Sequence, residues 1–593
     1  MIILPGKVKE FSARHAHALA VAACVALVYG SFHLFMLQEA TRLGGKYRPA
    51  IVEGNFDEGY YALRAAEAFR GDFPVGDTNL YEFRNSPAFL PILNPLVIAL
   101  LGWISGSLEN AFMLSDFLFP PIIFMFVYLI ARELISRRDA SIAFGALFMI
   151  APKFALLPSS AALPFFSSLR SLYFSRFEYP NVTFVFFAAA LYFILRTLKR
   201  PDQNSMIAAG VSTGLLFYTY FYDWTYILCG LLLLVLFLVF AKEYDRAKRI
   251  GGVIALALLV SVFYWVNFLK LIALPAFADL AERIGLEHGR MFRLEIVWTS
   301  YVRGLLLVFI LWSAGEIRRH KETLLFFAAF LLPIIVLLNV QVVTGFVPHP
   351  DHWHRTQFLI LALSLFVIFF ALLKSYEHAF SKLPESVCRM CAVVVIVGSL
   401  WYGINVNHSL SAQDGALFIK DQSHAYAYEW LRNNTRAGSV VGTLSSRTND
   451  EIILYTDNYI FTPNGLQTVA STEEIWRRAM FMGKIFNLTR DEFEAMVKAQ
   501  TLYFFVDQYR NASFNSYMKR MVREVPDSIL KEKLNDYDSL PDFSAADVPY
   551  TLDYVVVDAR SQLLGADNSY LSRYGQMVYR NAGIDVYRII ERR

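Results

Sequence analysis

Long apolar runs, separated by short loops rich in lysine and arginine, constrain this chain more than any other feature of its sequence. About 11 runs of roughly 17 to 22 residues are long enough to cross a hydrocarbon core of about 30 Å. Only 18% of the residues are charged, against about 25% in soluble proteins. The sequence therefore predicts an α-helical polytopic membrane protein. The runs lie near residues 16–37, 112–131, 140–157, 181–197, 206–222, 225–241, 251–272, 296–314, 323–340, 356–374 and 389–406.

The basic residues predict which loops face the cytoplasm, because short cytoplasmic loops carry an excess of lysine and arginine. They cluster before the first run and then in every second loop, which places the N-terminus inside. The first run has no small-residue cleavage site after it and is read as an anchor. The basic residues are Lys7, Lys9 and Arg14; Arg132, Arg137 and Arg138; Arg196, Lys199 and Arg200; Lys242, Arg246, Lys248 and Arg249; Arg318, Arg319 and Lys321; Lys374 and Lys382.

This alternation holds only if one further apolar stretch, Ala88 to Ile104, does not span the membrane. Pro87, Pro91 and Pro95 interrupt its helical hydrogen bonding. We expect a juxtamembrane or re-entrant piece, which is tolerated at membrane depth where protein or a water-filled cavity covers it. The loops then predicted to face outward are residues 38–111, 158–180, 273–295 and 341–355.

The region 407–593 is charged, mixed in pattern and long enough for a domain of its own. Alternating helical and β-rich runs predict an extracytoplasmic α/β domain there. Residues 1–406 would form the transmembrane catalytic domain. The expected helices are Tyr426–Asn433, Glu473–Met482 and Arg490–Ala499, and the expected strands are Ser439–Leu444, Leu502–Val506, Tyr554–Val557 and Ile584–Arg588.

Two adjacent carboxylates, Asp57 and Glu58, lie in the first outward loop. A carboxylate beside a membrane surface can act as a general base or bind a divalent cation. The amphipathic run from Tyr60 to Phe69 can lie in the interface and hold the pair at the depth of lipid phosphates. Tyr60 is a candidate substrate contact. The alternative is two solvated acids at a helix start, where the helix dipole favours them.

The second outward loop ends in Arg176-Phe-Glu178-Tyr-Pro-Asn. Arg176 can bind a phosphate through two parallel hydrogen bonds. Glu178 can complete an acid pair or a metal site with Asp57. Interfacial anchoring by arginine and aromatic residues is the alternative.

The last outward loop, His349 to Arg355, contains three histidines, an aspartate and an arginine. On an extended strand His352 and His354 would share a face and could bind a metal. Together with Arg355 they could instead bind the phosphate of an anionic lipid. A structural role is the third reading. Asp223 is expected in a very tight turn between the fifth and sixth runs, where it would cap the turn or, alternatively, line the cavity.

These residues together resemble the GT-C superfamily of glycosyltransferases, which use polyprenyl-phosphate-linked sugar donors. Members have an inside N-terminus and a large first external loop with an early acidic pair, as in Asp57-Glu58. The segment from Asn85 to Pro91 is similar to the proline-rich piece that follows, and Arg355 resembles the arginine that holds the lipid phosphate. Oligosaccharyltransferases carry Trp-Trp-Asp in the external domain, and residues 407–593 contain no such motif.

The resemblance implies a hexosyl- or pentosyltransferase that acts with inversion on the outer face of a prokaryotic plasma membrane, in cell-envelope glycan biosynthesis. Asp57 would be the base or a metal ligand, with Glu58 assisting, and Glu178 would be the second-loop acid. Mg²⁺ or Mn²⁺ is a possible cofactor at Asp57 and Glu178. Arg355, His352, His354 and Arg176 would bind the donor. The acceptor would be a glycan, a lipid or a protein, with membrane lipids around it.

Two other classes remain open: a lipid or polysaccharide transporter, and a non-catalytic membrane assembly protein. The predicted spans carry little charge, which argues against a transporter, and they are more numerous than an anchor requires. The net charge of +4 does not suggest nucleic acid as a partner.

Overall fold

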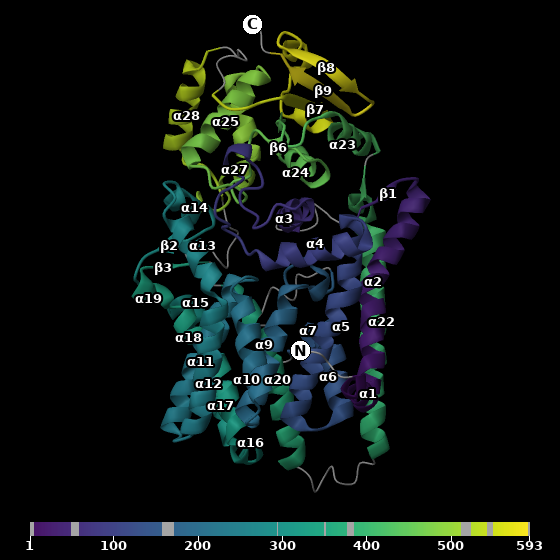
Figure 1. Cartoon of the computed structure of the whole chain (residues 1–593), viewed down its shortest axis with the longest axis vertical. Coiled ribbons are helices and arrows are strands. Elements are labelled where there is room, and N and C mark those ends of the chain that lie inside the picture. Colours follow the sequence, from purple (N-terminus) through teal and green to yellow (C-terminus); the bar gives the residue numbers. More distant parts are fainter. Residues whose placement is uncertain are drawn as a thin grey trace. The chain divides into compact units, whose positions relative to one another are not determined.

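The computed structural model describes residues 5–48, 58–156, 171–292, 294–348, 351–375, 385–420, 422–510, 523–541 and 549–590. The chain is mostly helical and separates into two compact units (Figure 1). The helical unit comprises Met1–Glu39, Ile104–Tyr264 and Gly289–Ala416. The α/β unit comprises Ala40–Trp103, Trp265–His288 and Leu417–Arg593. The sequence-based division of the chain into a transmembrane domain, residues 1–406, and an extracytoplasmic domain, residues 407–593, stays a prediction.

Each apolar run of the sequence is mostly helical in the part that the structure describes, with short non-helical breaks such as residues 217–220. Prolines explain two breaks, since Pro152 opens a new short helix after Ile150, and Pro333 does so after Leu331. The helices are α1 Pro5–Arg14, α2 Ala16–Leu43, α5 Leu108–Ile135, α6 Arg138–Ile150, α7 Pro152–Ala155, α9 Thr183–Lys199, α10 Gln203–Leu216, α11 Phe221–Phe240, α12 Tyr244–Val260, α13 Val262–Ile272, α15 Leu294–Ser313, α16 Gly315–Arg319, α17 Lys321–Leu331, α18 Pro333–Leu337, α19 Val340–Thr344, α20 Asp351–Ser375 and α22 Glu385–Asp414, with the short 3₁₀ turns η3 Tyr173–Ser175 and η4 Gly415–Phe418.

Five helices in the described part of the chain are long and apolar enough to cross a membrane: α2, α5, α11, α20 and α22. Helices α12 and α13 meet at a bend of 52° and would make a sixth span if they cross together. Helices α9 and α10 are only 17 and 14 residues long. A multi-pass helical fold is therefore confirmed, and the count of about 11 spans stays a prediction.

The stretch Ala88 to Ile104 contains helix α4, Leu93–Ser105. Its 13 residues extend about 20 Å at a rise of 1.5 Å per residue. A helix of this length is too short to cross a hydrocarbon core of about 30 Å. It belongs to the α/β unit.

A mixed five-stranded sheet, with strand order β6-β5-β7-β9-β8, forms the centre of the α/β unit (Figure 1). Strand β5 pairs in parallel with both β6 and β7, and the β7–β9 and β9–β8 pairs are antiparallel. The strands are β5 Val440–Gly442, β6 Tyr459–Ile460, β7 Tyr554–Asp558, β8 Gly575–Arg580 and β9 Ile584–Ile589.

The remaining elements of the α/β unit are mostly short helices, and a small antiparallel pair joins β1 to β4. The helices are α3 Glu58–Arg70, α14 Phe277–Arg283, α23 Gln422–Asn434, α24 Ser446–Tyr455, α25 Thr472–Ile485, α26 Arg490–Ala499, α27 Thr501–Phe505, α28 Asp527–Ser539, α29 Ala559–Leu563 and α30 Asn568–Leu571, with η1 Tyr81–Phe83. The two-residue strands of this unit are β1 Lys46–Tyr47, β2 Glu287–His288 and β4 Ile419–Lys420, whereas β3 Phe346–Val347 belongs to the helical unit.

The three predicted helices of this region are confirmed, as are three of its four strands. The strand expected at Leu502–Val506 is wrong, because these residues form α27 and bury three aromatic rings in one helical turn. A continuous apolar run does not distinguish a buried strand from a buried helix.

Two buried charged side chains attach early segments of the chain to the loop at residues 464–470. The Asp77 carboxylate accepts hydrogen bonds from Thr468 Oγ1 (2.6 Å) and Val469 N (2.9 Å), and from the backbone of residues 79 and 80. The Arg283 guanidinium donates to the carbonyl oxygens of residues 465, 468 and 470. Helix α3 packs along α24 in the same unit.

Replacing Asp77 by asparagine should destabilise the α/β unit by roughly 2 to 3 kcal/mol, because the new amide would place N–H groups against existing donors. Thermal unfolding of the detergent-purified protein measures this change. The exposed Asp527→Asn variant is the matched control and should melt like wild type. Equal melting temperatures for both variants would contradict the anchoring role of Asp77.

Candidate functional site

The loop before α9, which is predicted to face outward, enters this helix through a strained residue, Glu178. Its side chain lies 1% exposed and its backbone has a φ of 54°. The left-handed region is unfavourable for a residue with a side chain, and strain of this kind clusters at functional sites. The Glu178 carbonyl accepts hydrogen bonds from Val182 N and Thr183 N, which holds the loop against the first turn of α9.

Aromatic rings connect this loop to the first turn of α20. The Tyr179 ring stacks on Tyr220 with centroids 4.0 Å apart, and the Tyr220 hydroxyl is hydrogen-bonded to His352 Nδ1. The Tyr222 ring lies 4.7 Å from that of His352. The structure therefore brings His352 beside the second loop.

The two predicted phosphate-binding arginines, Arg176 and Arg355, both act electrostatically on the same pair of tyrosines, Tyr173 and Tyr179. Burial raises the pKa of Tyr173 to about 12, against the opposing effect of Arg355 and Arg176. Burial also raises the pKa of Tyr179, and the same two arginines oppose that rise. Arg176 and Arg355 come from distant loops and are thus gathered, with His352, around a buried aromatic pair. We call this group the tyrosine–arginine cluster.

A carboxylate that was expected in a tight turn, Asp223, lies instead inside the first turn of α11, which begins at Phe221. The turn assignment is wrong because the helix continues through this segment. Thr356 Oγ1 donates to Asp223 Oδ1 at 3.0 Å, and Oδ2 is buried without a hydrogen-bond partner among the described residues. Asp223 also acts on the pKa of both Tyr173 and Tyr179 and so borders the cluster. The sequence signal for a role of Asp223 in this cluster was its position, as an acid at the start of an otherwise apolar run.

Arg303 in α15 is a cation that the sequence indicated only weakly, as a residue flanking the entry of the eighth apolar run. Its Nη2 donates to Ser300 Oγ at 3.1 Å, while Nε and Nη1 are buried with no partner in the described part of the chain. Ser300 Oγ also lies 3.3 Å from His354 Nδ1. His354 is therefore linked to α15, on a different side of α20 from His352.

A shared metal-binding face for His352 and His354 is wrong, since both lie in a helix. Residues two apart in a helix do not face each other. Groups of three or more His, Cys, Asp or Glu suited to a metal ion are absent from the residues that the structure describes. Glu178 alone supplies a single carboxylate, so a divalent cation there stays a prediction that requires Asp57.

The acidic pair of the first loop belongs to the α/β unit. Asp57 lies outside the described residues, and Glu58 is the first residue of α3. Tyr60, in the first turn of α3, is 3% exposed and packs in the interior of that unit. The roles of these three residues rest on their positions in the sequence.

Comparison with solved structures finds similar folds. The chain is similar to ArnT from Cupriavidus metallidurans bound to undecaprenyl phosphate (14% identity, TM-score 0.49), covering 98% of each chain. It is also similar to the Archaeoglobus fulgidus oligosaccharyltransferase in complex with zinc and sulfate (13% identity, TM-score 0.43), covering 96% of this chain and 72% of that one. A third is the arabinofuranosyltransferase AftD from Mycobacteria (13%, TM-score 0.44), with 97% and 42% covered.

These proteins are of the superfamily that the sequence motifs resemble. No protein-family model and no curated protein matches the sequence.

Arg303→Met should raise the melting temperature of the ligand-free protein by a few degrees, because burying a cation with unsatisfied donors is costly. The same variant should lose part of the thermal stabilisation that added polyprenyl phosphate gives to wild type. Arg246→Met is the control, since Arg246 is paired with Glu243 and Glu322 and its loss should only destabilise. A lower melting temperature for ligand-free Arg303→Met would contradict a binding role.

Proposed function

We propose that this protein is an inverting glycosyltransferase that moves a sugar from a polyprenyl-phosphate-linked donor to an acceptor on the outer face of the membrane. The tyrosine–arginine cluster is the observation that carries the proposal. It combines two guanidinium groups with a histidine and several aromatic rings at the entry of a long apolar helix. Such a site offers cations for a phosphate and aromatic surface for an isoprenoid chain or a sugar ring.

Arg355 and Arg176 would bind the donor phosphate, with His352 and His354 assisting and Arg303 as a further cation. Arginine suits this task because its planar group presents paired donors that match phosphate oxygens. Charge builds on the phosphate as the bond to the sugar breaks, and fixed cations in a water-poor site stabilise that charge.

Asp57 would deprotonate the acceptor hydroxyl, with Glu58 assisting. The acceptor oxygen then attacks the anomeric carbon from the face opposite the phosphate. The new glycosidic bond forms while the bond to the phosphate oxygen breaks, and that oxygen keeps the electron pair. The proton ends on the Asp57 carboxylate, and the configuration at the anomeric carbon is inverted.

Asp223 would orient the donor sugar, because its unpartnered, buried Oδ2 can accept a hydrogen bond from a sugar hydroxyl. A divalent cation, Mg²⁺ or Mn²⁺, would be held by Asp57 and Glu178 if the reaction uses one. We place the protein in a prokaryotic plasma membrane with a cytoplasmic N-terminus, acting on a glycan, lipid or protein acceptor in the cell envelope.

A lipid or polysaccharide transporter is the second candidate, and one buried network favours it. Asp116 in α5 is buried, lies 3.1 Å from His33 Nε2 and accepts from Asn181 Nδ2 at 2.6 Å. Ionisable groups inside spans often mark transport paths. A transporter would move a lipid-linked sugar across a vesicle membrane without releasing polyprenyl phosphate.

Asp57→Asn should lower the rate of transfer by roughly 10²- to 10⁴-fold, the usual contribution of a general base. Purified protein incubated with polyprenyl-phosphate sugars and an envelope extract as acceptor source provides the assay, with released polyprenyl phosphate as the readout. Asp72→Asn, an exposed acid of the same loop, is the control and should keep wild-type activity. Full activity in Asp57→Asn would exclude Asp57 as the base.

Arg355→Gln should weaken donor binding and slow transfer by roughly 10²- to 10³-fold, as for loss of one charge-stabilising donor. Arg318→Gln, at an exposed position of α16, should change neither quantity. Titration with polyprenyl phosphate measures binding separately from turnover. Unchanged binding in Arg355→Gln would remove this residue from the phosphate site.

A further inference from the structure

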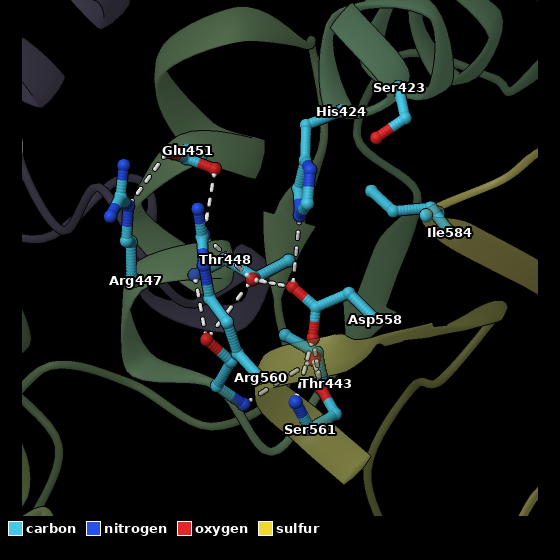
Figure 2. A network of polar contacts seen from close by, with 12 residues as sticks. Ser423, His424, Thr443, Arg447, Thr448, Glu451, Asp558, Arg560, Ser561 and Ile584 are labelled. Carbon is cyan, nitrogen blue, oxygen red and sulfur yellow. Dashed lines mark hydrogen bonds and ion pairs between the residues drawn. The ribbon is translucent and has the colours of Figure 1, made fainter. Parts of the chain in front are cut away.

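The carboxyl ends of β5 and β7 meet at a switch in the strand order of the α/β unit. From β5 the chain passes through α24 to β6 on one side, and later returns as β7 on the other side. Ligands of open α/β sheets bind at the carboxyl ends of parallel strands where the order reverses in this way. Figure 2 shows that polar side chains from four separate elements converge at this position.

Asp558, the last residue of β7, is the fully buried centre of this network (Figure 2). Its Oδ2 accepts from Thr448 Oγ1 at 2.6 Å and lies 3.2 Å from His424 Nε2, and its Oδ1 accepts from the backbone and hydroxyl of Ser561. Burial alone would raise the pKa of Asp558, but the hydrogen bonds from His424, Thr448 and Ser561 outweigh it and lower the pKa. The carboxylate is therefore a fixed negative charge beneath the surface.

A second buried carboxylate, Glu451, holds two arginines at the same place. Arg447 Nε donates to its Oε1 at 3.1 Å, and Arg560 Nη1 donates to its Oε2 at 3.1 Å. Tyr428 adds a hydrogen bond of 2.6 Å to Oε2. The Glu451 side chain is 8% exposed, whereas those of Arg447 and Arg560 are 34% and 28% exposed. The buried Glu451 carboxylate thus holds the partly exposed guanidinium groups of Arg447 and Arg560 in place.

Arg560 has donors to spare. Its Nη1 makes the contacts to Glu451 and Thr448, while Nε and Nη2 form no hydrogen bond to the residues that the structure describes. These two N–H groups lie on one edge of the planar guanidinium and form a fork that suits a pair of neighbouring oxygen atoms.

The charges near the Nε–Nη2 edge of Arg560 indicate whether this edge suits a charged or an uncharged pair of ligand oxygen atoms. The two arginines are balanced by Glu451 and Asp558, so the cluster has no excess positive charge to attract a phosphate or a carboxylate. Adjacent hydroxyl groups of a sugar offer the same spacing without charge. Helix α24 supplies Arg447, Thr448 and Glu451, and it packs along α3, the helix that follows the predicted base Asp57.

We propose that this cluster is the acceptor subsite and that it binds a carbohydrate through a pair of adjacent, uncharged hydroxyl groups. The inference rests on the proposed function and deepens it, because it makes the acceptor a neutral glycan. Arg560 provides the fork, and Glu451 and Arg447 position it.

The first test is direct binding. Full-length protein in lipid nanodiscs is applied to an array of neutral and uronic-acid oligosaccharides. Wild type should bind neutral glycans with vicinal hydroxyls, and Arg560→Met should reduce that binding at least tenfold. Arg580→Met is the control, because Arg580 is an exposed arginine of the same unit paired with Asp585, and it should bind like wild type. Preference for uronic acids, no glycan binding at all, or equal binding by Arg560→Met would overturn the proposal.

The second test separates the acceptor subsite from the donor chemistry. In Arg560→Met the KM for the acceptor should rise at least tenfold, while slow hydrolysis of the donor in the absence of acceptor stays at the wild-type rate. Arg447→Lys is a second variant that tests whether misfolding raises the acceptor KM. It should melt at the wild-type temperature and still show a raised KM for the acceptor. If wild type releases no polyprenyl phosphate but still binds neutral glycans through Arg560, the proposed function fails and the subsite stands.

Discussion

The burial of Asp77 and Arg283 against one loop, residues 464–470, is the constraint on which the α/β unit depends. A buried charge is tolerated only when its hydrogen bonds are satisfied. Asp77 finds partners 391 and 392 residues downstream and Arg283 finds partners 182 to 187 residues downstream, so both segments belong to the same unit as the C-terminal region. Helix α3 packs along α24 in the same unit.

The helical unit follows a different principle. Its interior is apolar and aromatic, and the charged groups that enter it are few and grouped. Arg176, Arg355 and His352 surround two buried tyrosines, while Asp223 and Arg303 retain polar atoms without partners among the described residues. Unsatisfied buried polar groups cost stability. Asp223 lies in the first turn of α11 and Arg303 lies near the middle of α15, and a ligand bound beside either group would supply its missing partner.

The sequence predicted the helical character of the chain and most of its long apolar helices, because long apolar runs are typical of membrane spans, but it did not predict α14, α24, α28, β6 or β8. The sequence-based predictions failed where the secondary structure is decided by tertiary packing, which a local residue pattern does not report. Leu502–Val506 has β-forming residues but is a buried helical turn, and Asp223 continues a helix rather than capping a turn. His352 and His354 were read on a strand and lie on a helix. The cluster around Arg560 could not be predicted from the sequence, because Glu451, Asp558 and Arg560 come together only when β5 and β7 pair.

The central claim is transfer of a sugar with inversion from a polyprenyl-phosphate donor, and the configuration of the product tests it most directly. Nuclear magnetic resonance of the product formed from a donor of known anomeric configuration measures the new glycosidic bond. We expect the configuration opposite to that of the donor, with one polyprenyl phosphate released for each bond formed. Retained configuration, or no release from any lipid-linked sugar, would contradict it.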